Sequence, residues 1–152
     1  MARSELAGAD WTLPAARNKV KVDLIRPLSS AAVAVLERLR AIGTGELVFT
    51  GDGRSPISGF SHFKAVFEKA CGVTGWTLHD LRRTARSLMS RAGVPTDHAE
   101  RCLGHVIGGV RGVYDRHAFL EEKWHAYEAL AGLIERIVHP PGENVVALHG
   151  AQ

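Results

Sequence analysis

The chain has 152 residues, 45% of them apolar, which is enough for one domain around a single hydrophobic core. Its net charge of +3 and its pI near 9.1 are modest, so an affinity for nucleic acid would require positive residues clustered on one part of the chain. No apolar run reaches membrane-spanning length, and the N-terminus lacks the charged-then-apolar pattern of a signal peptide.

The two cysteines, Cys71 and Cys102, are isolated and have no paired spacing. This argues against a zinc site and against a disulfide framework. We expect both to be ordinary buried thiols in a reducing cytosol. The sequence has no clear cluster of acidic residues that would bind a metal ion.

The first elements are expected to be two short β-segments. Residues 11–14 and residues 20–25 are the segments, residues 17–19 form a hairpin turn between them, and Pro27 closes the second segment. Residues 1–16 otherwise show weak periodicity.

Two helices and a short strand follow the hairpin. Ser29 or Ser30 is a plausible N-cap for a helix over residues 31–42, which Gly43 would end. A strand is expected at residues 47–49, followed by a turn-rich stretch at residues 51–56. Ser58 or Ser61 can cap a second helix that ends at Cys71 and buries an apolar side formed by Phe60, Phe63, Val66 and Phe67.

The central helix is expected to begin at Thr77, where Asp80 three residues later gives a start like a capping box, and to end at Gly93. Its predicted buried stripe consists of Leu78, Leu81, Ala85, Leu88 and Met89. The polar positions His79, Arg82, Arg83 and Arg86 recur at steps of three and four residues away from that stripe. His79 and Arg82 can therefore reach one ligand.

The remaining elements lead to a second histidine and a lone tyrosine. Thr96 caps a short helix through Cys102, and Gly104 forces a turn that presents His105. Three glycines then precede Tyr114. A long helix over residues 119–138 has an apolar side formed by Leu120, Trp124, Tyr127, Leu130, Leu133, Ile134 and Ile137. Residues 139–152 form a tail that is either disordered or pairs as an edge strand.

Two imidazoles, a guanidinium and a phenol suit chemistry on a phosphate, since cations hold its oxygens while a hydroxyl attacks phosphorus. Seven arginines lie in or beside this stretch: Arg82, Arg83, Arg86, Arg91, Arg101, Arg111 and Arg116. Structural roles compete with this interpretation. About half of the arginines would be explained by a solvated helix face. His79 could simply cap a helix, His105 could fill a turn, and Tyr114 could be a packed aromatic.

The motifs HDLRRT at residues 79–84, LGH at residues 103–105 and VYDRH at residues 113–117 resemble, in order and spacing, the catalytic domain of tyrosine recombinases, the phage integrase family. Residues 17–19 resemble the family's R-x-K hairpin and residues 26–29 its P-L-S helix start. The resemblance implies a mainly α fold with a small β-hairpin or sheet at the N-terminal side. It covers a domain at residues 1–138 and leaves residues 139–152 as the tail.

The resemblance also implies a role for each matching residue. Tyr114 would attack the phosphodiester and hold the DNA end as a phosphotyrosine. Arg82 would hold the non-bridging oxygens, and His79 and His105 would bind the phosphate or move the proton of the nucleophile. Lys19 would protonate the leaving 5′ oxygen, with Lys21 as the less favoured alternative. DNA contacts are expected from Arg83, Arg86, Arg111 and Arg116, and neither a cofactor nor a metal is implied.

The start of the chain departs from the family pattern. The family has a further arginine in a sequence near G-x-R-x-x-E, and here Ala2 stands at its position, with Arg3 one residue away. We therefore expect the chain to begin after the helix that carries this arginine and to lack the separate N-terminal DNA-binding domain. Losing one hydrogen-bond donor to the developing anion typically costs about 2.7–4 kcal/mol of transition-state stabilisation.

The resemblance implies two partners, double-stranded DNA and other recombinase protomers, which would form a tetramer on DNA. We expect a cytoplasmic protein that is bacterial or phage-encoded, and no membrane partner. Two alternatives remain open at this point. One is a module of the same fold that binds DNA or another recombinase without cutting. The other is an enzyme of the type IB topoisomerase kind, which relaxes supercoils.

Overall fold

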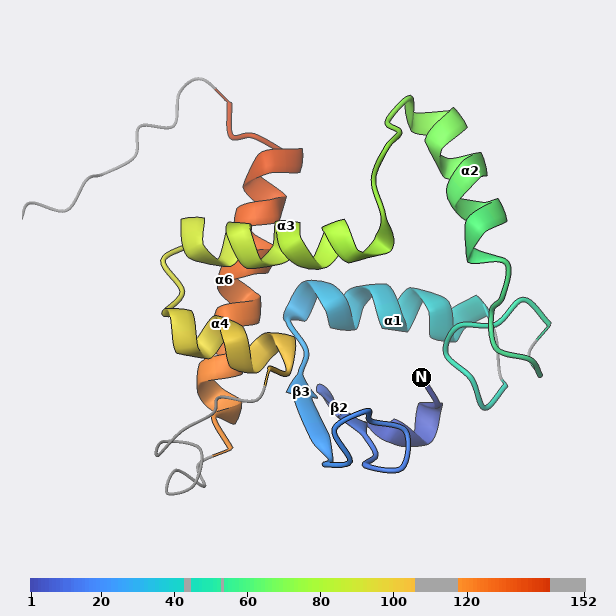
Figure 1. Cartoon of the computed structure of the whole chain (residues 1–152), viewed down its shortest axis with the longest axis horizontal. Coiled ribbons are helices and arrows are strands. Elements are labelled where there is room, and N and C mark those ends of the chain that lie inside the picture. The colour runs from blue at the N-terminus through green and yellow to red at the C-terminus, as the bar shows by residue number, and fades with distance from the viewer. Residues whose placement is uncertain (43–44, 53, 106–117, 143–152) are drawn as a thin grey trace, which may run out of the picture.

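The computed structural model describes residues 1–42, 45–52, 54–105 and 118–142. In these ranges the chain is mainly helical with a small sheet at its N-terminal side, as the sequence predicts (Figure 1). The helices are α1 (Ser30–Ile42), α2 (Phe60–Cys71), α3 (Leu78–Arg91), α4 (Thr96–Leu103) and α6 (Leu120–Val138). A short 3₁₀ turn, η1 (Arg3–Glu5), precedes the sheet.

The sheet has three antiparallel strands in the order β1 (Leu6–Ala7), β2 (Asp10–Leu13) and β3 (Leu24–Pro27). The predicted hairpin between β2 and β3 is confirmed, and Pro27 is the last residue of β3. The prediction that the second strand begins at Val20 is wrong. Lys21 has a φ of 56°, which a strand does not adopt, and the Ala15 N–H donates to the Asp23 carboxylate at 2.6 Å, so the connecting loop is wider than predicted.

Helix α6 organises the packing because it contacts α3, α4, β3 and α1. The core is formed by Met89 of α3, Ala99 and Cys102 of α4 and Ala126 of α6, and Val94, Tyr127 and Leu130 pack against it. Ser29 accepts the Ala32 N–H at 3.3 Å, in agreement with the predicted cap of α1. The N–H and the hydroxyl of Ser30 both donate hydrogen bonds to the Glu128 carboxylate, which joins α1 to α6.

The start of α3 is as predicted, and its buried face is only partly so. The Asp80 carboxylate accepts hydrogen bonds from the Thr77 N–H at 2.8 Å and from the Thr77 hydroxyl at 2.7 Å. Met89 is buried, but Leu78 and Leu81 are 53% and 58% exposed. The prediction of a continuous buried stripe is therefore wrong for the first turn of α3, since the core contact with α4 and α6 is made by Met89 near its C-terminal end.

Helix α2 ends at Cys71 as predicted, but neither its cap nor its burial is as predicted. Gly59 precedes the helix with a φ of 72°, and neither Ser58 nor Ser61 caps it. Figure 1 shows it at the edge of the molecule, away from α4 and α6. Its expected apolar side is more than half exposed at all four positions: Phe60, Phe63, Val66 and Phe67. Phe67 instead lies edge-on to Trp76, with ring centroids 6.1 Å apart, and Lys64 covers the Trp76 ring.

Two smaller predictions also need correction. Residues 47–49 do not form a strand, because within the described residues Leu47 makes one isolated bridge, to Ala2. Cys71 is exposed rather than buried, whereas Cys102 is buried as predicted and its burial raises the pKa of the thiol. No helix in the described part of the chain is long and apolar enough to cross a membrane.

Candidate nucleic-acid cleavage site

Helices α3 and α4 bring Arg82 and His105 together. Arg82 lies in the second turn of α3, and His105 follows the glycine that ends α4. Gly104 has a φ of 73°, and a Cβ on it would lie 3.2 Å from Leu24 of β3. The turn therefore favours glycine both for its conformation and for its close approach to the sheet.

The Arg82 guanidinium makes two hydrogen bonds with the turn. Its Nη2 donates to the Leu103 carbonyl at 2.6 Å and lies 2.8 Å from Nε2 of His105. A guanidinium has donors only, so Nε2 of His105 accepts this bond. Arg82 and His105, which the family resemblance assigns to the same phosphate, are thus in direct contact.

The other ring nitrogen of His105 contacts Glu100, a residue that the sequence analysis missed. His105 Nδ1 makes a short hydrogen bond to one Glu100 carboxylate oxygen, and the other oxygen accepts from Arg86 Nε at 2.8 Å. The bonds from Arg86 and then from His105 hold the pKa of Glu100 below its usual value. The sequence signal for this contact is weak: Glu100 lies on α4, a few residues before His105.

His79 and Arg83 lie on α3 beside this network. His79 is exposed in the first turn, three residues before Arg82. The Arg83 side chain is 74% exposed, and its Nη1 lies 3.4 Å from the Asp80 carboxylate. Arg86 is also predicted to contact DNA. In the structure its guanidinium donates hydrogen bonds to Glu100 and Ser90.

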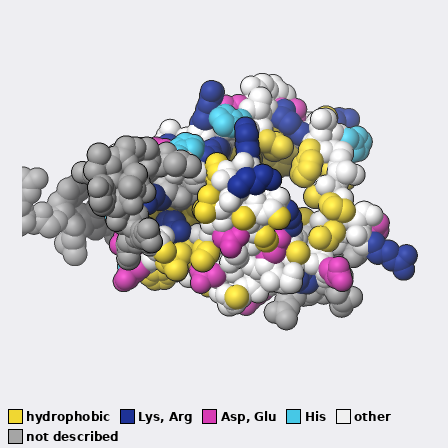
Figure 2. All heavy atoms as spheres, turned by 60° about the horizontal axis from the view of Figure 1, so that its bottom comes forward, with side chains coloured by type: hydrophobic (Ala, Val, Ile, Leu, Met, Phe, Trp, Pro, Cys, Tyr) yellow, Lys and Arg dark blue, Asp and Glu magenta, His cyan; other side chains and the backbone are white. Residues whose placement is uncertain are grey.

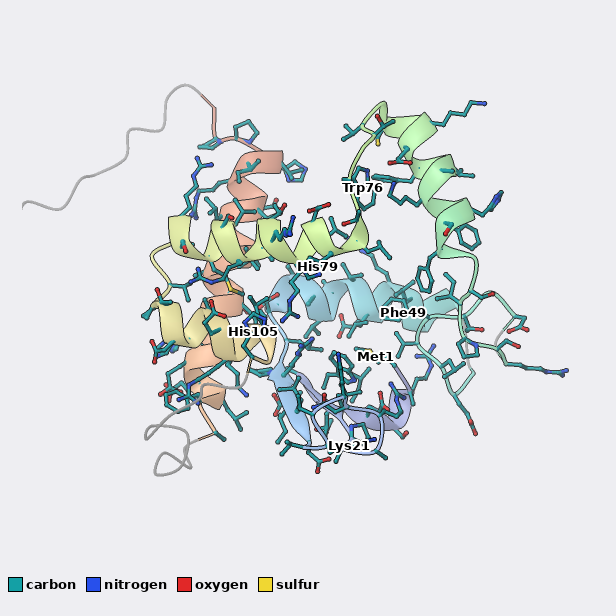
Figure 3. The ribbon with its side chains drawn as sticks, in the orientation of Figure 1. Met1, Lys21, Phe49, Trp76, His79 and His105 are labelled. Carbon is teal, nitrogen blue, oxygen red and sulfur yellow. The ribbon has the colours of Figure 1, made fainter. Side chains whose placement is uncertain are left out.

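Lys19 lies in the β2–β3 loop, which borders the same site. A hollow of about 190 Å³ is lined on one side by Asn18, Val20 and Val22 of the loop and on the other by Gly104 and His105. Lys19 itself is exposed, as is Lys21. In Figure 3, His79 lies on α3 and His105 just beyond α4, while Lys21 lies in the loop below them.

The loop and the turn are held by groups beneath them. The buried Lys123 of α6 donates its Nζ to the Ile25 carbonyl at 2.8 Å, and burial lowers the pKa of this lysine. Asn18 stabilises the loop by donating its side-chain amide to the Val22 carbonyl at 2.7 Å. The sequence analysis did not identify Lys123, because a lysine on an otherwise apolar helix side carries no motif.

Figure 2 shows Lys and Arg side chains beside histidines on one face of the molecule, next to exposed apolar side chains. This arrangement offers cations to a polyanion without a strongly basic chain overall. Tyr114, Arg111 and Arg116, the predicted nucleophile and two of the predicted DNA contacts, lie outside the described residues.

A mainly helical domain with a small N-terminal sheet, in which an arginine of one helix contacts the histidine of an L-G-H motif, is consistent with an integrase-type domain. The phage integrase family model matches residues 4–120, and the chain belongs to this family. The chain is 31% identical to prophage integrase IntA of Escherichia coli K12 over 132 residues, which is 84% of this chain and 32% of the relative.

Prophage integrase IntZ of the same organism is 31% identical over 136 residues, covering 88% of this chain and 34% of the relative. The chain therefore spans about a third of the length of the curated relatives that it matches. No solved structure matches it significantly. The predicted family and fold class are confirmed by these comparisons, whereas the roles of individual residues are not tested by them.

Proposed function

We propose that this chain is the catalytic part of a site-specific DNA recombinase that cuts and rejoins strands through a 3′-phosphotyrosyl intermediate. The observation that supports this best is the contact of Arg82 with His105 at 2.8 Å, next to a loop that carries lysines. A planar guanidinium and an imidazole on one surface suit the non-bridging oxygens of a phosphodiester.

Arg82 stabilises charge on the phosphate. Its contacts with Leu103 and His105 both use Nη2, which leaves other N–H groups of the guanidinium to donate to phosphate oxygens. Because the same contacts fix the guanidinium plane, little reorganisation is needed when negative charge develops on the oxygens. A lysine would supply charge without this fixed geometry.

The side chains alone can supply every bond exchange and proton transfer of the proposed reaction. The phenolic oxygen of Tyr114 forms a bond to phosphorus as the bond to the 5′ oxygen breaks, and His79 or His105 accepts the phenolic proton. Lys19 donates a proton to the departing 5′ oxygen. Attack of a 5′ hydroxyl on the phosphotyrosine reverses these steps and rejoins the strand.

A nicked duplex that loses its short 5′ fragment on cleavage tests this proposal, because the covalent complex then cannot reverse. The wild-type chain should form a complex that survives denaturing electrophoresis, and Tyr114→Phe should form none. Equal trapping by both proteins would show that Tyr114 is not the nucleophile.

A second candidate is a module that binds DNA or a recombinase and does not cut. It is favoured by Ala2, which stands where the family pattern has a further arginine. Such a module should bind DNA in a salt-sensitive and sequence-tolerant manner. Binding at low salt without any covalent complex would support it over the recombinase.

A further inference from the structure

We propose that Glu100 is a positioning residue for this reaction: its carboxylate keeps the proton of His105 on Nδ1, so that the Nε2 lone pair accepts from Arg82 and holds the guanidinium that meets the phosphate. The assignment of His105 to the phosphate rests on the proposed function. The protonation pattern of the ring does not, and it can be measured without DNA.

The pattern follows from the two contacts of the ring. Arg82 Nη2 can only donate, so His105 Nε2, at 2.8 Å from it, presents a lone pair. In a neutral ring the proton is then on Nδ1, where the Glu100 carboxylate accepts it. The ring thus sits between an obligate donor and an obligate acceptor, and turning it over would break both bonds.

Glu100 also holds the backbone from which the ring projects. The His105 N–H donates to the Glu100 carbonyl at 3.1 Å, across the turn made by Gly104. One residue therefore fixes both the main chain and the ring of His105. A partner of this kind fixes which ring nitrogen carries the proton and which one faces the neighbouring group.

Glu100 is itself held from a second helix. Arg86 of α3 donates its Nε to Glu100 at 2.8 Å, one helical turn beyond Arg82, which contacts the other side of the ring. The carboxylate is thus bonded on one oxygen to Arg86 and on the other to the ring. The phosphate-facing pair Arg82 and His105 therefore depends on a chain of contacts that runs through Glu100.

The first test is the ¹⁵N spectrum of the His105 ring in the free chain. The wild type should show the Nδ1–H form. In Glu100→Ala the ring has no acceptor on its Nδ1 side and can turn away from Arg82, so the Nε2–H form or a mixture should appear. Asp97→Ala, which removes another acid from the same helix, should leave the spectrum unchanged. If Glu100→Ala does not fold, Glu100→Leu keeps the volume without an acceptor and serves in its place. An unchanged ring form in the folded variant would overturn the proposal.

The second test is the rate of covalent trapping on the nicked duplex. Glu100→Ala should trap DNA about 10-fold more slowly or worse, Glu100→Gln should recover part of the rate because its amide oxygen still accepts, and Asp97→Ala should match the wild type. A changed ring form with an unchanged trapping rate would overturn the positioning role and leave the recombinase proposal standing. If the wild type traps no DNA, the recombinase proposal fails, and the ring spectrum still decides whether Glu100 sets the form of His105.

Discussion

The Tyr127 hydroxyl donates to the Cys102 carbonyl at 2.7 Å and fastens α6 to the last turn of α4. The next residue, Leu103, supplies the carbonyl that Arg82 binds. Burial raises the pKa of Tyr127, so its hydroxyl stays protonated and remains a donor. The long C-terminal helix thereby supports the turn that carries His105.

Tyr127→Phe should lower the free energy of unfolding by about 0.5–1.5 kcal/mol, because it leaves the Cys102 carbonyl without its donor. Urea denaturation followed by circular dichroism measures this loss. Trp124→Phe is the control, since Trp124 lies on the same helix and is 40% exposed. Equal losses in the two variants would mean that the hydroxyl contributes nothing.

Arg82→Lys should reduce covalent trapping by about 100- to 1,000-fold, because an ammonium cannot bond Leu103, His105 and two phosphate oxygens in one plane. The trapping rate on the nicked duplex measures this, with circular dichroism to confirm folding. Arg91→Lys, an exposed position in the last turn of α3, is the control and should trap as the wild type does. A similar rate for Arg82→Lys would contradict the role of the guanidinium.

Local signals in the sequence predicted where most helices begin and end, although Ser58, Ser61 and Thr96 do not cap their helices as expected. The Thr77 and Asp80 pair set the start of α3, Ser29 capped α1 and Gly104 ended α4 in a left-handed conformation, because each depends on neighbouring residues alone. The pairing of Arg82 with His105 was predicted from motif order. It could be predicted because a family resemblance reports the fold as well as the residues.

Burial could not be predicted in the same way. Phe63 and Leu81 have helical spacing, but spacing alone does not show whether another element covers an apolar side. Glu100 and Lys123 were missed because their partners come from other elements: the His105 loop and Arg86 for the first, and the Ile25 carbonyl for the second. Contacts of this kind depend on how helices pack and leave no periodic pattern in the sequence.

Two residues of α3 test where the core lies. Met89 is 1% exposed and packs against α4 and α6, so Met89→Ala should cost about 2–5 kcal/mol of unfolding free energy. Leu81 belongs to the predicted stripe but is 58% exposed, so Leu81→Ala should cost less than about 1 kcal/mol. Urea denaturation of both variants gives the comparison. A larger loss at Leu81 than at Met89 would place the core elsewhere on α3.

The stabilisation from Glu100 should depend on pH. Since Arg86 and His105 lower its pKa in the folded chain, the unfolded chain binds a proton first as the pH falls. The advantage of the wild type over Glu100→Gln should be complete above the unfolded-state pKa of about 4.3 and disappear as the pH drops through the lower folded-state value. We expect about 0.2–1 kcal/mol from this partly exposed group. Urea midpoints of the two proteins across this acid range measure it, and a constant difference would contradict it.

Gly104→Ala should destabilise the chain more than Gly93→Ala. Both glycines have a positive φ, 73° and 78°, so an alanine is strained at either position, by roughly 1 kcal/mol. A Cβ at Gly93 meets nothing within 4 Å, whereas a Cβ at Gly104 would lie 3.2 Å from Leu24, so the second variant must also move the turn away from β3.

Because His105 is the next residue, that movement should also weaken its contact with Arg82 at 2.8 Å. Gly104→Ala should therefore slow covalent trapping under conditions in which it remains folded, and Gly93→Ala should not. Denaturation midpoints and trapping rates of the two variants measure the two effects separately. If both variants lose the same stability and trap DNA equally fast, the close approach of Gly104 to β3 does not position His105.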